Sequence, residues 1–68
     1  MNIYLFLIEE TGEDSKFNDY HLASSKINAI KELYKNWGKE EFNNDFVIIS
    51  IEDLGEGNQQ DLDDLKQF

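Results

Sequence analysis

Two continuous runs of apolar residues, one near each end of the chain, predict buried β-strands. The first, Ile3–Glu10, reads IYLFLIEE and has six apolar residues in succession before two acids. Its aromatic and β-branched side chains favour a strand over a helix, and the lack of alternation indicates burial on both faces. The second, Phe46–Leu54, reads FVIISIEDL and ends before Gly55 and Gly57. Because it also starts as an uninterrupted apolar run, we expect it to lie deep in the sheet.

A polar cluster and a loosely alternating segment follow the first run. Thr11–Ser15 contains a glycine among polar residues and predicts a hairpin loop. The next segment, Phe17–Leu22, reads FNDYHL and places Phe17, Asp19 and His21 on one side of a strand. Polar residues at alternate positions are typical of an edge strand, where they oppose the addition of another chain. This segment is therefore predicted to be a second strand at an edge.

The clearest helical pattern begins after Ser24 and Ser25, either of which can act as the N-cap. We expect a helix from Ser25 to Trp37, followed by Gly38 as a left-handed C-cap. Its apolar residues recur at spacings of three and four and form one stripe for packing on the sheet: Ile27, Ile30, Leu33, Tyr34 and Trp37. The segment after it, Glu40–Asp45, is predicted to be a polar connection.

These elements predict a single small α+β domain built on a three-stranded antiparallel sheet. A right-handed crossover from the second to the third strand leaves room for the first between them, which gives the spatial order 2-1-3. The amphipathic helix covers one face of the sheet in this ββαβ domain, which occupies residues 1–57. Residues 58–68 are an acidic C-terminal segment, read either as a short helix through Leu62, Leu65 and Phe68 or as a frayed tail.

Composition excludes several classes of protein. The 68 residues fit one domain, and the absence of cysteine rules out disulfides, thiolate metal sites and cysteine nucleophiles. The longest apolar run, Ile3–Ile8, is too short to span a membrane, and no basic segment precedes it as in a signal peptide. Fifteen acidic residues against six lysines give a net charge of −9, which disfavours direct binding to nucleic acid. We expect a cytoplasmic protein without a cofactor.

The negative charge is concentrated in the last part of the chain. Residues 1–39 hold six acids and five lysines, whereas residues 40–68 hold nine acids and one lysine. The segment Tyr20–Lys39, which contains the predicted helix, is itself basic, with four lysines against Glu32: Lys26, Lys31, Lys35 and Lys39. Because the third strand runs antiparallel to the first, the acidic end of the third strand lies at the end of the sheet away from the hairpin. We therefore expect two acidic poles unless the C-terminal segment folds back.

His21 is the only histidine and the one candidate for catalytic chemistry. Asp19 lies on the same side of the predicted strand, and Ser24 and Ser25 follow. A Ser-His-Asp triad, however, is assembled from separated elements around an oxyanion hole. We therefore expect a half-exposed histidine on an edge strand and no enzymatic activity. The C-terminal acids do not fit the spacing of an EF-hand loop in any register, so no dedicated metal site is expected.

The acidic surface is the feature on which a function can rest. A strongly negative protein surface is attracted to basic grooves on other proteins, and such grooves mostly hold nucleic acid. We hypothesise that the chain occupies such a groove, and so inhibits a nucleic-acid-binding enzyme, without chemistry of its own. The carboxylates expected to make the contact are Glu52, Asp53, Glu56, Asp61, Asp63 and Asp64. A second candidate patch consists of Glu13, Asp14 and Asp19.

Several features together make the chain resemble, as a class, the small acidic proteins that phages and mobile elements direct against host defence. These features are the short single domain, segments such as GEDSKFND and EDLGEGNQQDLDD, lysine without arginine, and seven asparagines. Anti-CRISPR proteins and DNA mimics are members of this class. The resemblance is one of class rather than of motif. It implies an inhibitor, acting in the host cytoplasm, whose partner is a basic nucleic-acid-binding protein or complex of a host defence system, such as a CRISPR effector.

The alternative is a small structural or regulatory interaction module. One helix covers only one face of a three-stranded sheet, and the two apolar strands imply that the other face is apolar as well. A homodimer formed through that face would supply the missing layer and stabilise a short chain.

Overall fold

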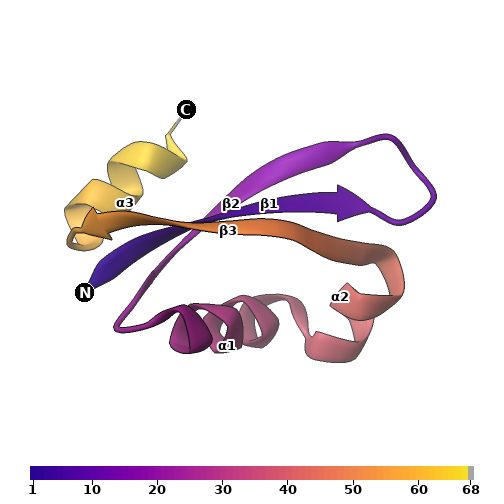
Figure 1. The fold of residues 1–68 in the computed structure, drawn as a ribbon, viewed down its shortest axis with the longest axis horizontal. Coiled ribbons are helices and arrows are strands. Elements are labelled where there is room, and N and C mark those ends of the chain that lie inside the picture. The colour runs from indigo at the N-terminus through magenta and orange to yellow at the C-terminus, as the bar shows by residue number, and fades with distance from the viewer. Residues whose placement is uncertain (68) are drawn as a thin grey trace.

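The computed structural model describes residues 1–67, in which three β-strands form one antiparallel sheet (Figure 1). The strands are β1 (Asn2–Glu10), β2 (Lys16–Ala23) and β3 (Phe46–Glu56), and their order in the sheet is β2-β1-β3. β1 is central and antiparallel to both neighbours. The predicted α+β fold and its strand order are therefore confirmed, as is the hairpin loop between β1 and β2.

Two helices lie on one face of the sheet and a third lies toward the other (Figure 1). α1 (Lys26–Trp37) and α2 (Lys39–Asp45) connect β2 to β3, and α3 (Gln59–Lys66) follows β3. The sheet thus has one face covered along most of its length and another covered at one end.

Among residues 1–67, no helix is long and apolar enough to cross a membrane.

The ends of α1 follow from local hydrogen bonding. The Oγ of Ser25 accepts a hydrogen bond from the backbone N–H of Asn28 at 3.2 Å, which confirms Ser25 as the N-cap. Gly38 has a φ of 82°, a conformation that glycine adopts without the steric cost of a side chain. Its N–H donates to the carbonyl of Tyr34 at 2.8 Å and ends the helix.

The packing stripe of α1 differs from the predicted one. Ala29 and Leu33 are fully buried against the sheet, whereas Ile27 is 66% exposed and Trp37 is 40% exposed. Ile30 and Tyr34 are half-buried beside the core. The stripe is therefore centred on Ala29 and Leu33, and Ile27 lies outside it.

The prediction of a polar connection over Glu40–Asp45 was wrong, because the whole segment belongs to α2. Phe42 is only 1% exposed and packs against the rings of Trp37 and Phe46, with centroid separations of 5.9 and 5.5 Å. A seven-residue helix is marginal by itself, so this aromatic packing is what stabilises it.

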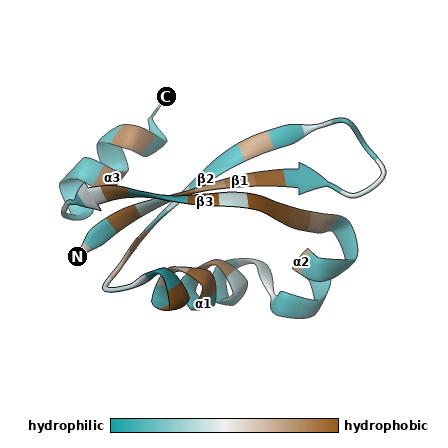
Figure 2. Cartoon of the chain, viewed as in Figure 1, coloured by the Kyte–Doolittle hydropathy of each residue, from teal (hydrophilic) through white to brown (hydrophobic). Residues whose placement is uncertain are grey.

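The prediction that the third strand lies deep in the sheet was also wrong. β3 is an edge strand, and every one of its residues is partly or fully exposed. It also continues past Leu54 through Gly55 to Glu56. Figure 2 shows the hydrophobic first half of this strand and the hydrophilic stretch that follows it. The buried core lies instead along β1, where Tyr4, Phe6 and Ile8 face α1 and α2.

The C-terminal segment forms a helix rather than a frayed tail. Asn58 and Asp61 make a capping box, in which each side chain accepts from the other residue's backbone N–H. Leu62 is 6% exposed and Ile3, on the face of β1 opposite Phe6, is 5% exposed. Gly57 packs closely on Ile3 and donates its N–H to the carbonyl of Met1 at 2.9 Å. Phe68, the last residue of the predicted stripe, lies outside the described residues.

Candidate functional site

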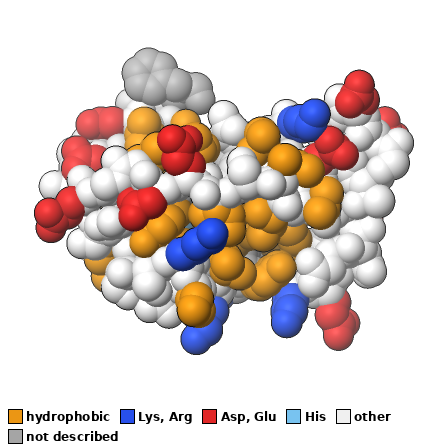
Figure 3. Space-filling view, viewed as in Figure 1, with side chains coloured by type: hydrophobic (Ala, Val, Ile, Leu, Met, Phe, Trp, Pro, Cys, Tyr) orange, Lys and Arg blue, Asp and Glu red, His pale blue; other side chains and the backbone are white. Residues whose placement is uncertain are grey.

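The six C-terminal carboxylates predicted to bind a partner are all exposed and come from two neighbouring elements. We call this group the acidic pole; it consists of Glu52, Asp53, Glu56, Asp61, Asp63 and Asp64. The first three belong to the second half of β3 and the others to α3. Figure 3 shows acidic side chains gathered toward the two ends of the molecule, with hydrophobic side chains between them.

Asp53 is held in place by its neighbours on the sheet. Its two carboxylate oxygens accept hydrogen bonds from the Nδ2 of Asn2 at 3.1 and 3.0 Å. Its Oδ1 also accepts from the backbone N–H of Gly55 at 2.8 Å. These contacts fix the carboxylate at the end of β3 near the start of β1, while leaving it exposed to solvent.

The acids of α3 occupy positions with different consequences for the helix. Asp61, in the first turn, stabilises the helix by capping and by its favourable interaction with the macrodipole. Asp63 and Asp64 lie in the last turn, where a negative charge is unfavourable. Their carboxylates accept hydrogen bonds from Gln59 and Gln60, at 2.9 and 3.0 Å. Asp61 therefore stabilises the start of α3, whereas at Asp63 and Asp64 the unfavourable charge is offset by helix-stabilising hydrogen bonds from residues four positions earlier.

No carboxylate of the acidic pole is neutralised by an ion pair within residues 1–67. The ion pairs in that part of the chain are Lys16 with Glu9, at 3.5 Å, and His21 with Asp19. The pole therefore presents its full negative charge to solvent. The same residues contain no group of three or more His, Asp or Glu that could hold a metal ion.

The second predicted patch is not one surface. Glu13 and Asp14 are exposed in the hairpin loop, at the end of the sheet away from α3. A hydrogen bond from the N–H of Thr11 to the carbonyl of Asp45 brings the junction of α2 and β3 to the same end. Asp19 lies apart from them in the middle of β2 and is partly buried. The structure thus separates the loop carboxylates from the third member of the predicted patch.

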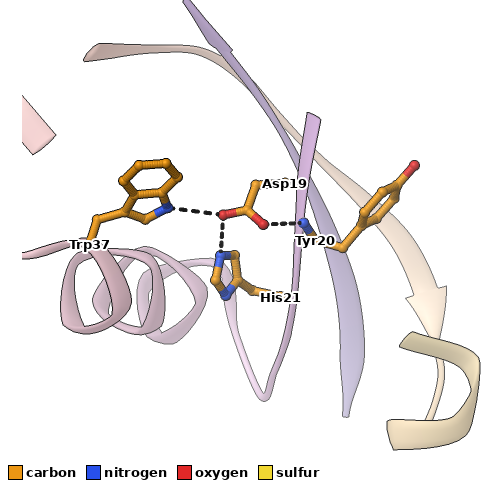
Figure 4. A network of polar contacts seen from close by, with 4 residues as sticks. All are labelled: Asp19, Tyr20, His21 and Trp37. Carbon is orange, nitrogen blue, oxygen red and sulfur yellow. Dashed lines mark hydrogen bonds and ion pairs between the residues drawn. The ribbon is translucent and has the colours of Figure 1, made fainter. Parts of the chain in front are cut away.

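Asp19 is the centre of a partly buried polar network that links β2 to α1 (Figure 4). Its Oδ2 lies 2.9 Å from Nε2 of His21 and accepts a hydrogen bond from Nε1 of Trp37 at 3.2 Å. Its Oδ1 accepts from the backbone N–H of Tyr20 at 3.1 Å. His21 is 3% exposed and packs edge-on against Phe6, so the prediction of a half-exposed histidine was wrong.

Opposing effects set the pKa of Asp19. Burial raises the pKa, because the charged form loses hydration. The hydrogen bonds with His21 and Trp37, and the electrostatic interactions with His21 and Lys66, favour the charged form and outweigh that effect. The pKa of Asp19 therefore lies below its ordinary value of 3.8. The carboxylate serves the fold, and its contacts leave it poorly placed to bind a partner.

The serines next to this network are engaged elsewhere. The Oγ of Ser24 accepts from Nδ2 of Asn28 at 2.7 Å, and the Oγ of Ser25 caps α1. Neither contact directs a hydroxyl toward His21, so the geometry of an acyl-transfer triad is not formed. Asp19 and His21 do lie on one side of β2, as their spacing predicts, but the contribution of Trp37 comes from a residue 18 positions away and has no local signal in the sequence.

A shallow hollow lies beside the C-terminal end of β2. It has a volume of about 330 Å³ and its lining comes from β2 (His21, Leu22), α1 (Glu32, Asn36) and α3 (Gln59, Leu62, Lys66), with Met1. The two helices therefore flank this edge of the sheet from either side.

Comparison with protein-family models, curated proteins and solved structures finds no match. The proposed function therefore rests on the geometry of the chain itself.

Proposed function

We propose that the protein is an acidic inhibitor that binds a basic, nucleic-acid-binding surface on another protein through the acidic pole. The observation that carries this proposal is that six exposed carboxylates share one end of the molecule and none has an ion-pair partner within residues 1–67. Asp63 and Asp64 lie in the last turn of α3, where their charges oppose the macrodipole, and both remain exposed to a partner.

The physical basis is competition for cationic side chains. Duplex DNA carries one negative charge per about 1.7 Å of axis, and proteins neutralise it with lysine and arginine. Carboxylates on one face of a strand recur about every 6.6 Å, and α3 adds further charges beside β3. A protein of net charge −9 is steered toward such a surface at long range. Enzymes of host defence that hold nucleic acid in a basic groove are the class of partner this chemistry fits.

The test compares two variants with the same net charge. In the first, Glu52→Gln, Glu56→Gln, Asp63→Asn and Asp64→Asn remove charge from the acidic pole while keeping Asp53 and Asp61, which have structural contacts. In the matched control, Glu10→Gln, Glu13→Gln, Asp14→Asn and Glu40→Gln remove the same charge near the hairpin end. Each immobilised protein captures partners from a bacterial lysate at low salt, and duplex DNA is added as competitor.

The proposal predicts that the unmodified protein and the control retain nucleic-acid-binding proteins that DNA and salt release. The variant of the acidic pole should lose them while keeping the same circular dichroism spectrum. Equal retention by both variants would show that binding, if any, does not use the acidic pole.

Self-association through the sheet is a second candidate. It is favoured by Leu5, Leu7 and Tyr20, which lie on the face opposite α1 and stay half-exposed because α3 covers only one end of that face. Analytical ultracentrifugation over a wide concentration range tests it. A dimer whose dissociation constant is insensitive to salt, and is raised by Leu7→Ser, would support this function.

A further inference from the structure

The two edges of the sheet differ in how they are protected. Toward its C-terminal end, around His21 and Leu22, β2 is flanked by α1 and α3 at the hollow already described. Within residues 1–67, the outer edge of β3 has no such cover, since the only helix in substantial contact with β3 is α2, which immediately precedes it. Alternate N–H and C=O groups of an edge strand point away from its neighbour and are available for pairing. β3 is thus the open edge of this sheet.

The sequence of β3 does little to close that edge. Edge strands are protected by lysine and other charged side chains, proline, bulges or short length; β3 is 11 residues long without lysine or proline, and its protection is confined to three carboxylates and two irregularities of register. Of the six large hydrophobic residues that are most exposed, three lie on this strand: Val47 at 46%, Ile49 at 48% and Leu54 at 44%. The apolar residues lie mainly in its first half and the carboxylates of Glu52, Asp53 and Glu56 in its second.

Two irregularities limit where pairing can occur. The register with β1 shifts between Ile48 and Ser50, and again between Asp53 and Glu56, where Gly55 has a φ of 98°. Such bulges increase the local twist of a strand. Between them, Ser50–Asp53 pairs regularly with β1, so this stretch is the straight part of the open edge.

We propose that β3 accepts one extended segment of the partner protein as an additional, antiparallel strand, with basic residues of that segment beside Glu52 and Asp53. This inference rests on the proposed function and specifies how the acidic pole is engaged. Backbone hydrogen bonds to the open edge supply affinity, and side chains select the sequence, as in other cases of strand addition. Oppositely charged residues directly across a strand pair attract one another, whereas like charges repel.

Charge and polarity specify the order of residues in the added segment. An antiparallel segment places its N-terminal residues beside the acidic half of β3 and its C-terminal residues beside Val47 and Ile49. The segment that matches β3 therefore has basic residues at its N-terminal end and apolar residues after them. A second copy of this chain fits less well, because its own β3 contains no basic residue to place beside Glu52 and Asp53.

The test uses a synthetic peptide of about eight residues, a common strand length, with two N-terminal lysines followed by alternating threonine and valine. Two derivatives carry N-methyl groups on alternate backbone nitrogens, one set at even positions and the other at odd positions. Successive N–H groups of a strand point to opposite edges, so each derivative blocks one edge and keeps the same side chains and charge. Affinity is measured by fluorescence anisotropy and pairing by amide hydrogen exchange.

Strand addition predicts that one derivative binds like the parent peptide while the other loses about tenfold or more in affinity. Exchange should slow at β3 amides and not at β2. Equal binding of both derivatives, abolished by salt, would overturn strand addition while leaving the proposed function intact. Failure of all three peptides to bind would also overturn it, and capture of basic partners by the whole protein would then still support the function. Protection of β3 in a peptide-free dimer would assign the edge to a second copy.

Discussion

The indole Nε1 of Trp37 donates a hydrogen bond to Oδ2 of Asp19 at 3.2 Å, which ties the last residue of α1 to the middle of β2. The same oxygen lies 2.9 Å from Nε2 of His21, which is almost completely buried. A single carboxylate oxygen thus joins a helix, a strand and the hydrophobic core. Among the carboxylates proposed from the sequence as binding residues, Asp19 is the one with this structural role.

Asp19→Asn should lower the free energy of unfolding by about 2 kcal/mol, because hydrogen bonds to a charged group contribute more than neutral ones. The substitution removes the charge that faces His21 and weakens the bond from Trp37. Urea unfolding measures the effect. Asp53→Asn is the matched control, since Asp53 also accepts side-chain hydrogen bonds but is exposed, and its loss should be clearly smaller. Equal losses would contradict the structural role of Asp19.

The contribution of Asp19 should also depend on pH. Its folded-state pKa lies below the ordinary value of 3.8, so the folded protein favours the ionised form more than the unfolded chain does. The resulting stability is fully present above that ordinary value and is lost as the pH falls through the lower, folded-state pKa. Since the amide of the Asp19→Asn variant cannot titrate, the stability difference between the two proteins should shrink as the pH falls below 3.8. A difference that grows as the pH falls below 3.8 would have the wrong sign.

Leu33→Ala should destabilise the domain by about 2–5 kcal/mol, because the leucine is fully buried between α1 and the sheet. Ile27→Ala is the control on the same helix. Ile27 is 66% exposed, so its truncation should cost far less. Thermal or urea unfolding of the two variants measures where the packing stripe of α1 is centred. A larger loss of stability for Ile27→Ala than for Leu33→Ala would show that the stripe is centred where the sequence predicted it.

Leu62→Ala should cost about 2 kcal/mol, near the lower end for buried leucines, because α3 covers only one end of its face. The substitution removes the buried side chain of α3, on the side of the sheet where Ile3 lies. Leu65, which is half-buried on the same helix, provides the control substitution Leu65→Ala. Amide exchange across α3 should rise in the Leu62→Ala variant and less so in the other. An unchanged unfolding midpoint for Leu62→Ala would mean that α3 contributes little to the core.

The elements that local sequence could predict are those with strong local signals. Ser25 and Gly38 delimit α1 because capping and positive φ depend on the residues themselves. α2 has no comparable signal, since its seven residues contain one large apolar side chain, Phe42, and the helix depends on distant aromatic partners. Short helices stabilised by packing are therefore poorly predicted from sequence.

The candidate site was predictable only in part for the same reason. Sequence places an excess of acids after residue 39, but their gathering at one end requires α3 to form and dock through Leu62. The apolar run of Phe46–Ile51 suggested a deeply buried strand, although the strand order itself places β3 at an edge. A run of hydrophobic residues cannot by itself distinguish burial within a domain from a surface that another chain can cover.

The unequal protection of the two sheet edges has a consequence for how far this sheet can grow. A sheet with two open edges can add strands at both sides, and identical molecules can then polymerise without limit. Here α1 and α3 flank the outer edge of β2 around His21 and Leu22, so β3 is the more open edge of the sheet formed by residues 1–67. A foreign strand added to β3 would become the new edge, whereas pairing of the β3 strands of two molecules would bury both open edges. In such a pair only the β2 edges would remain at the two sides of the joint sheet, so extension through β3 would end at two molecules.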